Sequence, residues 1–462
     1  MNTTLARVQS SKSSTTQKPF YYYSSLKHSL CFLTTFITLL LFFQLQALKS
    51  PSYLWPFRYG ETTIELNRTR SMLRDSVTFI PLRDLRFAKE PMSGHTWFMS
   101  SMNDTFEDGD AEYLHFPSQA SKGRLLCLSA SDVSDGTKNS YALAWPEALP
   151  YNSILLPGLT FVADTYYDYN NIWHGLSAII PFVSWHQKKD CVVPARWVLF
   201  HWGELRTKMG TWVRTIAEAA IGKVPILQKF DDGGPTCFEE AVVFRHNHGA
   251  MPKAKRVEMH DAMRCKARAY CNVGKVAGDD AAAIQMTLFL RTGARSFRNE
   301  TAVIKIFDEE CRKVVSCRIK VERPDNLTFC EQVKLLSETD ILVTPHGAQL
   351  TNLFFMDKNS SVMEFYPKGW KEMAGVGQYV YRWLADWSGM QHRGSWWDPD
   401  GEPCPDEKDK FHCFAFHKDR QIGHDEVHFA GWAAKVLQEV KGYKMSVASG
   451  RSSQESASCE CS

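Results

Sequence analysis

A short turn containing one histidine and one glycine follows an apolar run in the last third of the chain. The run is Ile341–Val343, and the turn is His346-Gly347-Ala348. Gly347 has no Cβ, so the backbone can approach a ligand there, and His346 can add a donor or a positive charge. A strand, a glycine turn and a helix start together favour a bound phosphate, because the first N–H groups of a helix are unpaired and carry partial positive charge. A purely structural turn is the alternative interpretation.

Two arginines and a glutamate stand at comparable places on neighbouring predicted strands. Arg291 follows the apolar run Ile284–Leu290, Arg295 comes shortly after it, and Glu364 lies near the end of the predicted strand Ser361–Phe365. Arginine presents a rigid fork of donors to phosphate oxygens, so both arginines suit a diphosphate. Glu364 could accept hydrogen bonds from ribose hydroxyls. The alternatives are a solvated arginine pair and a structural salt bridge of the glutamate.

The region around these residues alternates between strand and helix patterns. Such a βαβ series predicts a parallel sheet with helices on both faces, and ligands of such sheets bind at the carboxyl ends of the strands. Thr328 and Glu331 fit a capping box at the start of one helix. The predicted strands are Ile284–Leu290, Val314–Val321, Ile341–Thr344 and Ser361–Phe365, and the predicted helices are Glu300–Cys311, Thr328–Ser337 and the segment after the glycine turn.

An earlier α/β unit is predicted over residues 91–272, with a linker at Arg264–Asp280 before the second unit at 273–442. Short apolar runs indicate its strands, and Thr207–Ile221 has helical spacing. Val427–Val440 is predicted to be a closing helix, and 443–462 a disordered tail. The fold class is therefore α/β, with two Rossmann-like domains facing a cleft. The strands of the first unit are expected at Arg124–Leu128, Ile154–Leu156, Trp197–Phe200, Val224–Leu227 and Glu240–Phe244.

An uncharged, apolar run at Leu30–Leu48 has the length of a transmembrane helix. The residues before it include lysines and an arginine but no acidic residue, which predicts a cytoplasmic tail at 1–29, an anchor at 30–48, a stem at 49–90 and a luminal remainder. A cleaved signal peptide is the alternative. The net charge of +3 gives no reason to expect nucleic acid as a partner.

The cysteines fit an oxidising compartment. Of 13 cysteines, Cys31 lies in the predicted anchor, which leaves an even number outside the membrane. Their pairing does not follow from sequence, but three groups are close enough in the chain for local bridges. These groups are Cys265/Cys271, Cys311/Cys317/Cys330 and Cys404/Cys413.

Four segments, in the same order along the chain, resemble blocks of glycosyltransferase family 61. Ile341–Phe355 followed by Ser361–Phe365 resembles the family's C-terminal signature, and Leu288–Phe297 is similar to its strand followed by spaced arginines. Asn171–Phe182 resembles its Asn-aromatic-His block, and Thr236–Val243 looks like its Cys-Phe block. The Gly- and Trp-rich stretch that begins at Ala374 looks most like a plant branch of the family.

The resemblance implies a GT-B fold and an inverting transfer from a UDP-sugar to a glycan acceptor. Plant members act in the Golgi on wall polysaccharides such as xylan, or on N-glycans, and several use UDP-xylose or UDP-arabinose. The resemblance thus implies a single-pass type II Golgi membrane protein with a luminal catalytic domain, which could form complexes with other glycosyltransferases. No cofactor and no obligatory metal are expected.

The catalytic base is less clear, because this chain departs from the family's pattern. Gln349 replaces a glycine of the signature, and Gly175 and Ala178 occupy places where many plant members have aspartate. His174 is the first candidate for the base or for acceptor positioning, because a neutral imidazole accepts a proton near neutral pH. Asp164 and Asp168, which come shortly before His174, are the next candidates. A core histidine, and a catalytically silent luminal member that binds glycans or acts as a scaffold, are the alternatives.

Two further motifs imitate metal sites. Asp108-Gly-Asp110 has the form of a metal–diphosphate clip but follows no apolar strand. His424 and His428 have helical spacing, but Asp425 stands where a metalloprotease helix needs glutamate. Neither motif therefore predicts a metal centre.

Overall fold

The computed structural model describes residues 33–41, 55–85, 111, 113–164, 170–230, 233–244, 251–274 and 283–449. Contacts divide the chain into two compact units, residues 1–70 and 71–462. Within the predicted anchor, only 33–41 is described, and it is helical. None of the helices in the described ranges is both long and apolar enough to cross a membrane. The remainder of the Leu30–Leu48 prediction lies outside the described residues.

The predicted stem contains regular structure. A polar helix, α2, spans Trp55–Asp75, and it is followed by strand β1 at Ile80–Pro81 and a 3₁₀ turn, η2, at Leu82–Leu85. Leu82 and Leu85 are fully buried, and β1 pairs with a strand of the first sheet. The first folded domain therefore begins before the predicted boundary at residue 91.

The first sheet has eight strands, in the order β1-β4-β3-β8-β5-β6-β7, with β2 paired to β8. Only β5 runs parallel to β6 and to β8, and the other pairs are antiparallel. The sheet is thus mixed rather than the parallel sheet of a Rossmann-like domain. Predicted strand Val224–Leu227 does not form, since only Leu227 makes an isolated bridge to Trp197. The strands are β2 (Tyr113–Phe116), β3 (Leu125–Ala130), β4 (Asn139–Ala144), β5 (Ile154–Asp164), β6 (Arg196–His201), β7 (Glu204–Arg206) and β8 (Thr236–Phe244).

Helices α4 (Ile172–Lys188) and α5 (Thr211–Ile221) pack closely on each other. Asn171 caps α4, because its side chain accepts a hydrogen bond from the N–H of Trp173. A Cβ on Gly175 would lie 2.4 Å from Cγ2 of Val213, so a side chain at this position would separate the two helices. The glycine that departs from the family pattern is therefore explained by this contact.

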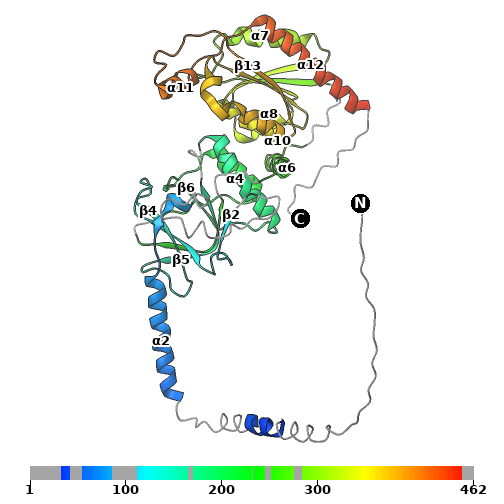
Figure 1. Cartoon of the computed structure of the whole chain (residues 1–462). Helices are drawn as coiled ribbons and strands as arrows, with labels where there is room; N and C mark the ends of the chain where they lie inside the picture. Colours follow the sequence, from blue (N-terminus) through cyan, green and yellow to red (C-terminus); the bar gives the residue numbers. More distant parts are fainter. Residues whose placement is uncertain are drawn as a thin grey trace, which may run out of the picture. The chain divides into compact units, whose positions relative to one another are not determined.

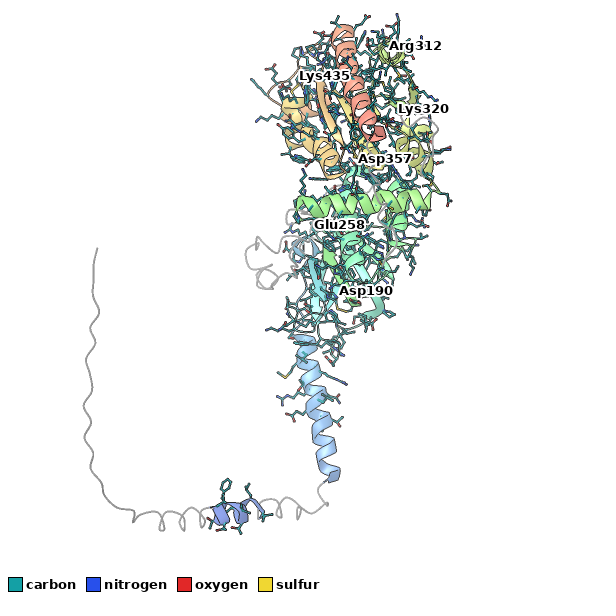
Figure 2. All side chains as sticks on the ribbon, turned by 90° about the vertical axis from the view of Figure 1, so that its right-hand side faces the viewer. Asp190, Glu258, Arg312, Lys320, Asp357 and Lys435 are labelled. Carbon is teal, nitrogen blue, oxygen red and sulfur yellow. A yellow bond between two sulfur atoms is a disulfide. The ribbon has the colours of Figure 1, made fainter. Side chains whose placement is uncertain are left out.

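The predicted linker at Arg264–Asp280 is partly helical. Helix α6 spans Lys253–Tyr270, and Figure 2 labels Glu258 on it. The Arg264 guanidinium donates hydrogen bonds to the carbonyls of Phe354 (2.7 Å) and Ser388 (2.6 Å) and is buried. The segment resembled a linker because it is polar and basic. In the structure, however, Arg264 donates hydrogen bonds to buried carbonyls instead of facing solvent. Residues 275–282 lie outside the described residues.

The second sheet is fully parallel, with strand order β10-β9-β11-β12-β13, so the predicted βαβ series is confirmed. The capping box of Thr328 and Glu331 is present. Strand β13 and helix α10 form in the Gly- and Trp-rich stretch that begins at Ala374. The elements are β9 (Ile284–Phe289), α7 (Glu300–Arg312), β10 (Cys317–Glu322), η3 (Pro324–Asn326), α8 (Phe329–Ser337), β11 (Ile341–Pro345), η4 (Ala348–Phe355), β12 (Ser361–Tyr366), α9 (Trp370–Ala374), η5 (Gly375–Tyr379), α10 (Val380–Trp387), β13 (Gln391–Trp397), α11 (Lys410–Lys418) and α12 (Glu426–Ser449).

Helix α12 extends beyond the predicted closing helix and into the predicted disordered tail. The extension is held by Lys444, whose Nζ donates to Oδ2 of Asp340 at 2.8 Å, and by Tyr443, whose hydroxyl accepts from Asn359. Residues 450–462 lie outside the described residues.

The second sheet carries helices on both faces. Figure 1 shows α7 and α12 on one face and α8 and α10 on the other. Phe307 of α7 and Phe429 of α12 pack against Phe365 of β12 in the core of the first face. On the second face, η4, α8 and α10 share a hydrophobic core with α4, α5 and α6, so the elements beside the glycine turn are fixed by the earlier half of the chain.

Disulfides link the described cysteines, as an oxidising compartment would allow. Cys311–Cys317 and Cys404–Cys413 form within the predicted groups. Cys271 pairs with Cys330, which ties the end of α6 to the start of α8. Cys127 pairs with Cys237 across β3 and β8, and Cys191 and Cys265 are also disulfide-bonded.

Candidate functional site

Arg291 and the His346 turn follow two adjacent strands, β9 and β11, so they lie at the same edge of the parallel sheet. The hydroxyl of Thr344 donates to the Phe289 carbonyl at 2.7 Å, and the N–H of His346 donates to the Phe365 carbonyl at 2.8 Å. These bonds fix the ends of β9, β11 and β12 against one another. Arg291 and the His346 turn thus lie at the carboxyl ends of the strands, which is where ligands of parallel sheets bind.

The glycine turn is tightly filled by its neighbours. A Cβ on Gly347 would lie 2.2 Å from Nη1 of Arg291 and 2.3 Å from Oε1 of Gln349, so a side chain here would require both of these side-chain ends to move. Gln349 donates from Nε2 to the Pro345 carbonyl at 2.6 Å, which closes the turn from inside. Ala348 begins η4, so the helix predicted after the turn forms as a 3₁₀ helix. The departure from the family's glycine is therefore accommodated by a hydrogen bond within the turn.

Arg291 and Arg295 bring two guanidinium groups beside this turn without acidic partners. Arg291 donates only to the His346 carbonyl, at 3.3 Å, and Arg295 lies 5.4 Å above the Trp370 ring. The Nε atoms of both arginines are buried without a hydrogen-bond partner, and neither arginine forms an ion pair with any residue that the structure describes. Unpaired buried cations are unfavourable unless an anion binds beside them.

Burial lowers the pKa of both guanidinium groups. The pKa of Arg295 falls to about 10, first because of burial and then because the charge of Arg291 is near. Burial also lowers the pKa of Arg291, and the nearby charges of Asp325 and Asp419 offset this lowering only in part. Both groups stay charged at neutral pH, so the strand edge presents two adjacent positive charges in a partly desolvated place.

A buried carboxylate joins two histidines behind the turn. Oε1 of Glu364 lies 2.7 Å from Nδ1 of His346, and Oε2 lies 2.9 Å from Nε2 of His392. Glu364 has no exposed surface, and both of its oxygens are engaged. The geometry therefore gives Glu364 the task of orienting the two imidazoles, in place of the predicted contact with ribose hydroxyls.

The protonation of this group follows from its hydrogen bonds. Burial by itself would raise the pKa of Glu364, but the hydrogen bonds from His346 and His392 outweigh it and lower the pKa to about 2. Burial lowers the pKa of His346, although Glu364 acts in the opposite direction. At neutral pH a neutral His346 thus donates from Nδ1 to an ionised Glu364. Nε2 of His346 then carries a lone pair and has no hydrogen-bond partner among the described residues.

Aromatic rings enclose His346. Tyr366 stacks on its ring with centroids 4.6 Å apart, Tyr381 approaches edge-on at 5.2 Å, and Trp370 lies at 5.8 Å. The ring of Trp173, in the first turn of α4, lies 5.9 Å from that of Tyr381. The aromatic wall therefore links the glycine turn to the start of α4.

The predicted catalytic residues are placed unevenly. His174 follows Trp173 in the first turn of α4 and is partly buried. Asp168 lies outside the described residues. His392, Tyr366 and Trp370 were not predicted as site residues, and Tyr381 was indicated only by its place in the Gly- and Trp-rich stretch.

A family model and a curated relative both match glycosyltransferases. The model of the Glycosyltransferase 61 family matches residues 160–363, which contain Arg291, the His346 turn and α4. Xylan glycosyltransferase MUCI21 of Arabidopsis thaliana is 27% identical over 110 residues, which cover 23% of this chain and 21% of that protein. The match thus spans about a fifth of the curated relative.

Among solved structures, rubredoxin oxygen:oxidoreductase from the anaerobe Desulfovibrio gigas aligns with 9% identity. The alignment has a TM-score of 0.22 and covers 69% of this chain and 66% of that one, a likeness too low to carry an argument. The chain is thus similar to the glycosyltransferase 61 family over residues 160–363, and the glycine turn and both arginines lie within this range.

Proposed function

We propose that this chain transfers a sugar from a UDP-sugar to a glycan, with inversion at the anomeric carbon. One observation carries the proposal: two guanidinium groups without acidic partners among the described residues lie beside the glycine turn, where Nη1 of Arg291 comes close to Gly347. A diphosphate supplies the missing negative charge, and arginine forks match its oxygens. The α/β pair of sheets is consistent with a GT-B-like arrangement, in which the second sheet holds the nucleotide.

The reaction needs charge compensation on the leaving group and a base for the acceptor hydroxyl. Arg291 and Arg295 are placed to offset the charge that grows on the diphosphate. His174 is the proposed base, because it lies in the first turn of α4, which contacts the aromatic wall around His346 through Trp173. Removal of the hydroxyl proton by the imidazole lets the acceptor oxygen attack the anomeric carbon as the UDP leaves from the opposite side.

The finer assignments rest on sequence. We propose a pentose donor, UDP-xylose or UDP-arabinose, and a wall polysaccharide such as xylan as acceptor, which suits the printed name of the matched relative. We also propose a single-pass type II Golgi membrane protein anchored through Leu30–Leu48. The disulfides of the described residues support a luminal catalytic domain.

Donor affinity is expected to rise as pH falls. In the free protein burial keeps the pKa of His346 low, and its Nδ1 proton is committed to Glu364. A phosphate oxygen that binds at Nε2 of His346 needs a proton on that nitrogen. Donor binding therefore raises the pKa of His346, and the protein takes up a proton when the donor binds. Affinity therefore increases as pH drops through the bound-state pKa and levels off below the lowered pKa of the free protein. Calorimetric titration with a UDP-sugar across this range measures the effect.

A UDP-sugar is the correct ligand for this titration, because the terminal phosphate of UDP itself titrates near pH 6. His346→Gln supplies the control, since an amide neither gains nor loses a proton. The variant is expected to bind with an affinity that does not change over the same pH range. An equal pH dependence in the variant and the wild-type protein would contradict the role of His346.

The proposed function is tested with the purified protein and a panel of UDP-sugars. We expect UDP to raise the melting temperature, and one pentose donor to release UDP when a xylan oligosaccharide is present. His174→Ala is expected to lower kcat about a hundredfold, the usual loss when a general base is removed, with little change in donor affinity. Unchanged kcat in this variant would remove His174 as the base.

The second candidate function is that of a catalytically silent protein that binds glycans or acts as a scaffold. It is favoured because this chain has Gly175 and Ala178 where many plant members of the family have aspartate. It predicts that the panel yields neither UDP release nor a shift in melting temperature with UDP. A xylan oligosaccharide would still bind to such a protein.

A further inference from the structure

Two adjoining cavities lie along β13, the edge strand of the second sheet. They have volumes of about 600 Å³ and 470 Å³, within the usual range of ligand sites. Both are lined by Arg393, Gly394 and Ser395 of β13 and by Trp432 and Lys435 of α12. Figure 2 labels Lys435 on α12. Together they form one groove along the strand, named here the β13 groove.

Gly394 keeps the β13 groove continuous. Its φ of 108° lies in the region that disfavours side chains, and the pairing of β13 with β12 is irregular at this point. A Cβ on Gly394 would stand 4.0 Å from Cζ2 of Trp432, in the space that both cavities border. The glycine therefore leaves open a passage that any side chain would narrow.

The same irregularity argues against the addition of a further strand at this edge. The N–H of Gly394 is directed to Nδ1 of His392 at 3.3 Å, so it is not offered to an incoming backbone. A bulged edge strand also twists away from regular pairing. The occupant of the groove is therefore more suitably recognised by side chains than by main-chain hydrogen bonds.

Positive charge is spread along the β13 groove. Lys371 of α9, Arg382 of α10 and Lys435 of α12 line it, and none of the three forms an ion pair with a described residue. Arg393 is paired with Glu439 at 2.7 Å, which is the only carboxylate among the lining residues of either cavity. Three cations on three separate elements suit a ligand whose negative charges are distributed along its length, rather than one compact diphosphate.

Aromatic rings stand between these charges. Trp432 is partly buried against Phe365, with ring centroids 5.2 Å apart, and Tyr379 is 43% exposed. Trp397 stacks on Tyr366 and lies 5.6 Å from the ammonium of Lys371. Flat aromatic surfaces with an apolar body pack well on the C–H faces of sugar rings. Aromatic rings and dispersed cations together match a chain of sugars that carry carboxylates.

We propose that the β13 groove binds an acidic oligosaccharide, with uronic acid carboxylates on Lys371, Arg382 and Lys435 and sugar faces on the aromatic rings. Neither Arg291, Arg295 nor His346 lines the groove, and the one lining residue that it shares with the site around Glu364 is His392, which lies behind the turn. It is thus a second glycan site, apart from the proposed diphosphate site. Its occupancy does not depend on the transfer reaction, so binding can be measured without turnover.

The test uses a short linear oligogalacturonide and the same oligomer with its carboxylates methyl-esterified. The purified wild-type protein is expected to bind the acidic form, with an affinity that falls as salt is added, and to bind the ester at least about tenfold more weakly. Lys435→Glu with Arg382→Glu is expected to weaken binding of the acidic form by about a hundredfold. Both side chains are exposed, so the fold should be retained.

Lys441→Glu is the matched control, because Lys441 is an exposed lysine of the same helix that does not line the groove. Its binding should equal that of the wild-type protein. Equal binding of the acid and its ester, or equal losses in both variants, would overturn the proposal.

Two competitions separate other occupants. Displacement of the oligogalacturonide by a UDP-sugar would overturn the proposal and make the groove part of the donor site. Tighter binding of polyglutamate than of the oligogalacturonide would also overturn it, in favour of an acidic protein partner. The proposal predicts that neither competitor displaces the bound oligomer at matched ionic strength.

Discussion

Replacing Arg291 with methionine is expected to weaken the binding of a UDP-sugar by close to a thousandfold, or about 4 kcal/mol. The side chain is placed to give two charge-assisted hydrogen bonds to the diphosphate, and each is worth about 1.5–3 kcal/mol. Methionine keeps much of the apolar stem but offers no donor. Because Arg291 has no acidic partner among the described residues, its removal leaves no carboxylate unpaired, and the free energy of unfolding should change little.

Two companion variants sharpen this result. Arg291→Lys keeps the charge but loses the fork, so it should recover only part of the affinity. Arg312→Met is the matched control, because Arg312 lies exposed on α7, where it pairs with Asp308 within the same helix (Figure 2). Titration calorimetry should show wild-type affinity for this control. If Arg291→Met bound the donor as well as Arg312→Met, the diphosphate site would be elsewhere.

Replacing Glu364 with glutamine is expected to lower the free energy of unfolding by about 3 kcal/mol and to weaken donor binding. Both imidazoles donate to the carboxylate, through Nδ1 of His346 and Nε2 of His392. The amide of glutamine can accept only one of these bonds, and its NH₂ group faces the other donor. One of the two imidazoles would therefore lose the acceptor that fixes its ring, and the pair that holds His346 in place would be weakened. Denaturant unfolding followed by donor titration at low temperature measures both effects.

The pair of measurements also decides between two roles for Glu364. A contact with ribose, as the sequence suggested, predicts lost affinity with unchanged stability. An orienting role predicts loss of both. Glu309→Gln on the exposed side of α7 is the control, and it should change the free energy of unfolding by less than about 0.5 kcal/mol.

The pH dependence of the free energy of unfolding should fit the orienting role of Glu364. Because the pKa of Glu364 is lowered to about 2 in the fold from a usual value of 4.5, its contribution is complete above pH 4.5 and is lost as the pH falls toward 2.

The second sheet and the placement of its candidate site residues could be predicted because local patterns there agree with the fold. The buried parallel strands are continuous apolar runs, and the turn at Gly347 is fixed by contacts with residues that the sequence already marked, Arg291 and Gln349. The capping box at Thr328 is a local hydrogen-bond pattern, so it could be read directly from residue types.

The missed features depend on contacts between distant residues. His392 joins the site only because β13 pairs with β12 and brings its ring to Glu364. Helix α6 looked like a linker because its stability comes from Arg264 and the carbonyls of Phe354 and Ser388, far away in the chain. The mixed first sheet likewise arises from antiparallel partners that no short pattern specifies.

A crystal structure with a bound UDP-sugar tests the central claim most directly. The diphosphate is predicted to lie within hydrogen-bonding distance of the guanidinium groups of Arg291 and Arg295 and of Nε2 of His346, over the turn at Gly347. A diphosphate bound elsewhere, for example among Lys371, Arg382 and Lys435 of the β13 groove, with Arg291 and Arg295 still lacking an anion, would contradict the account.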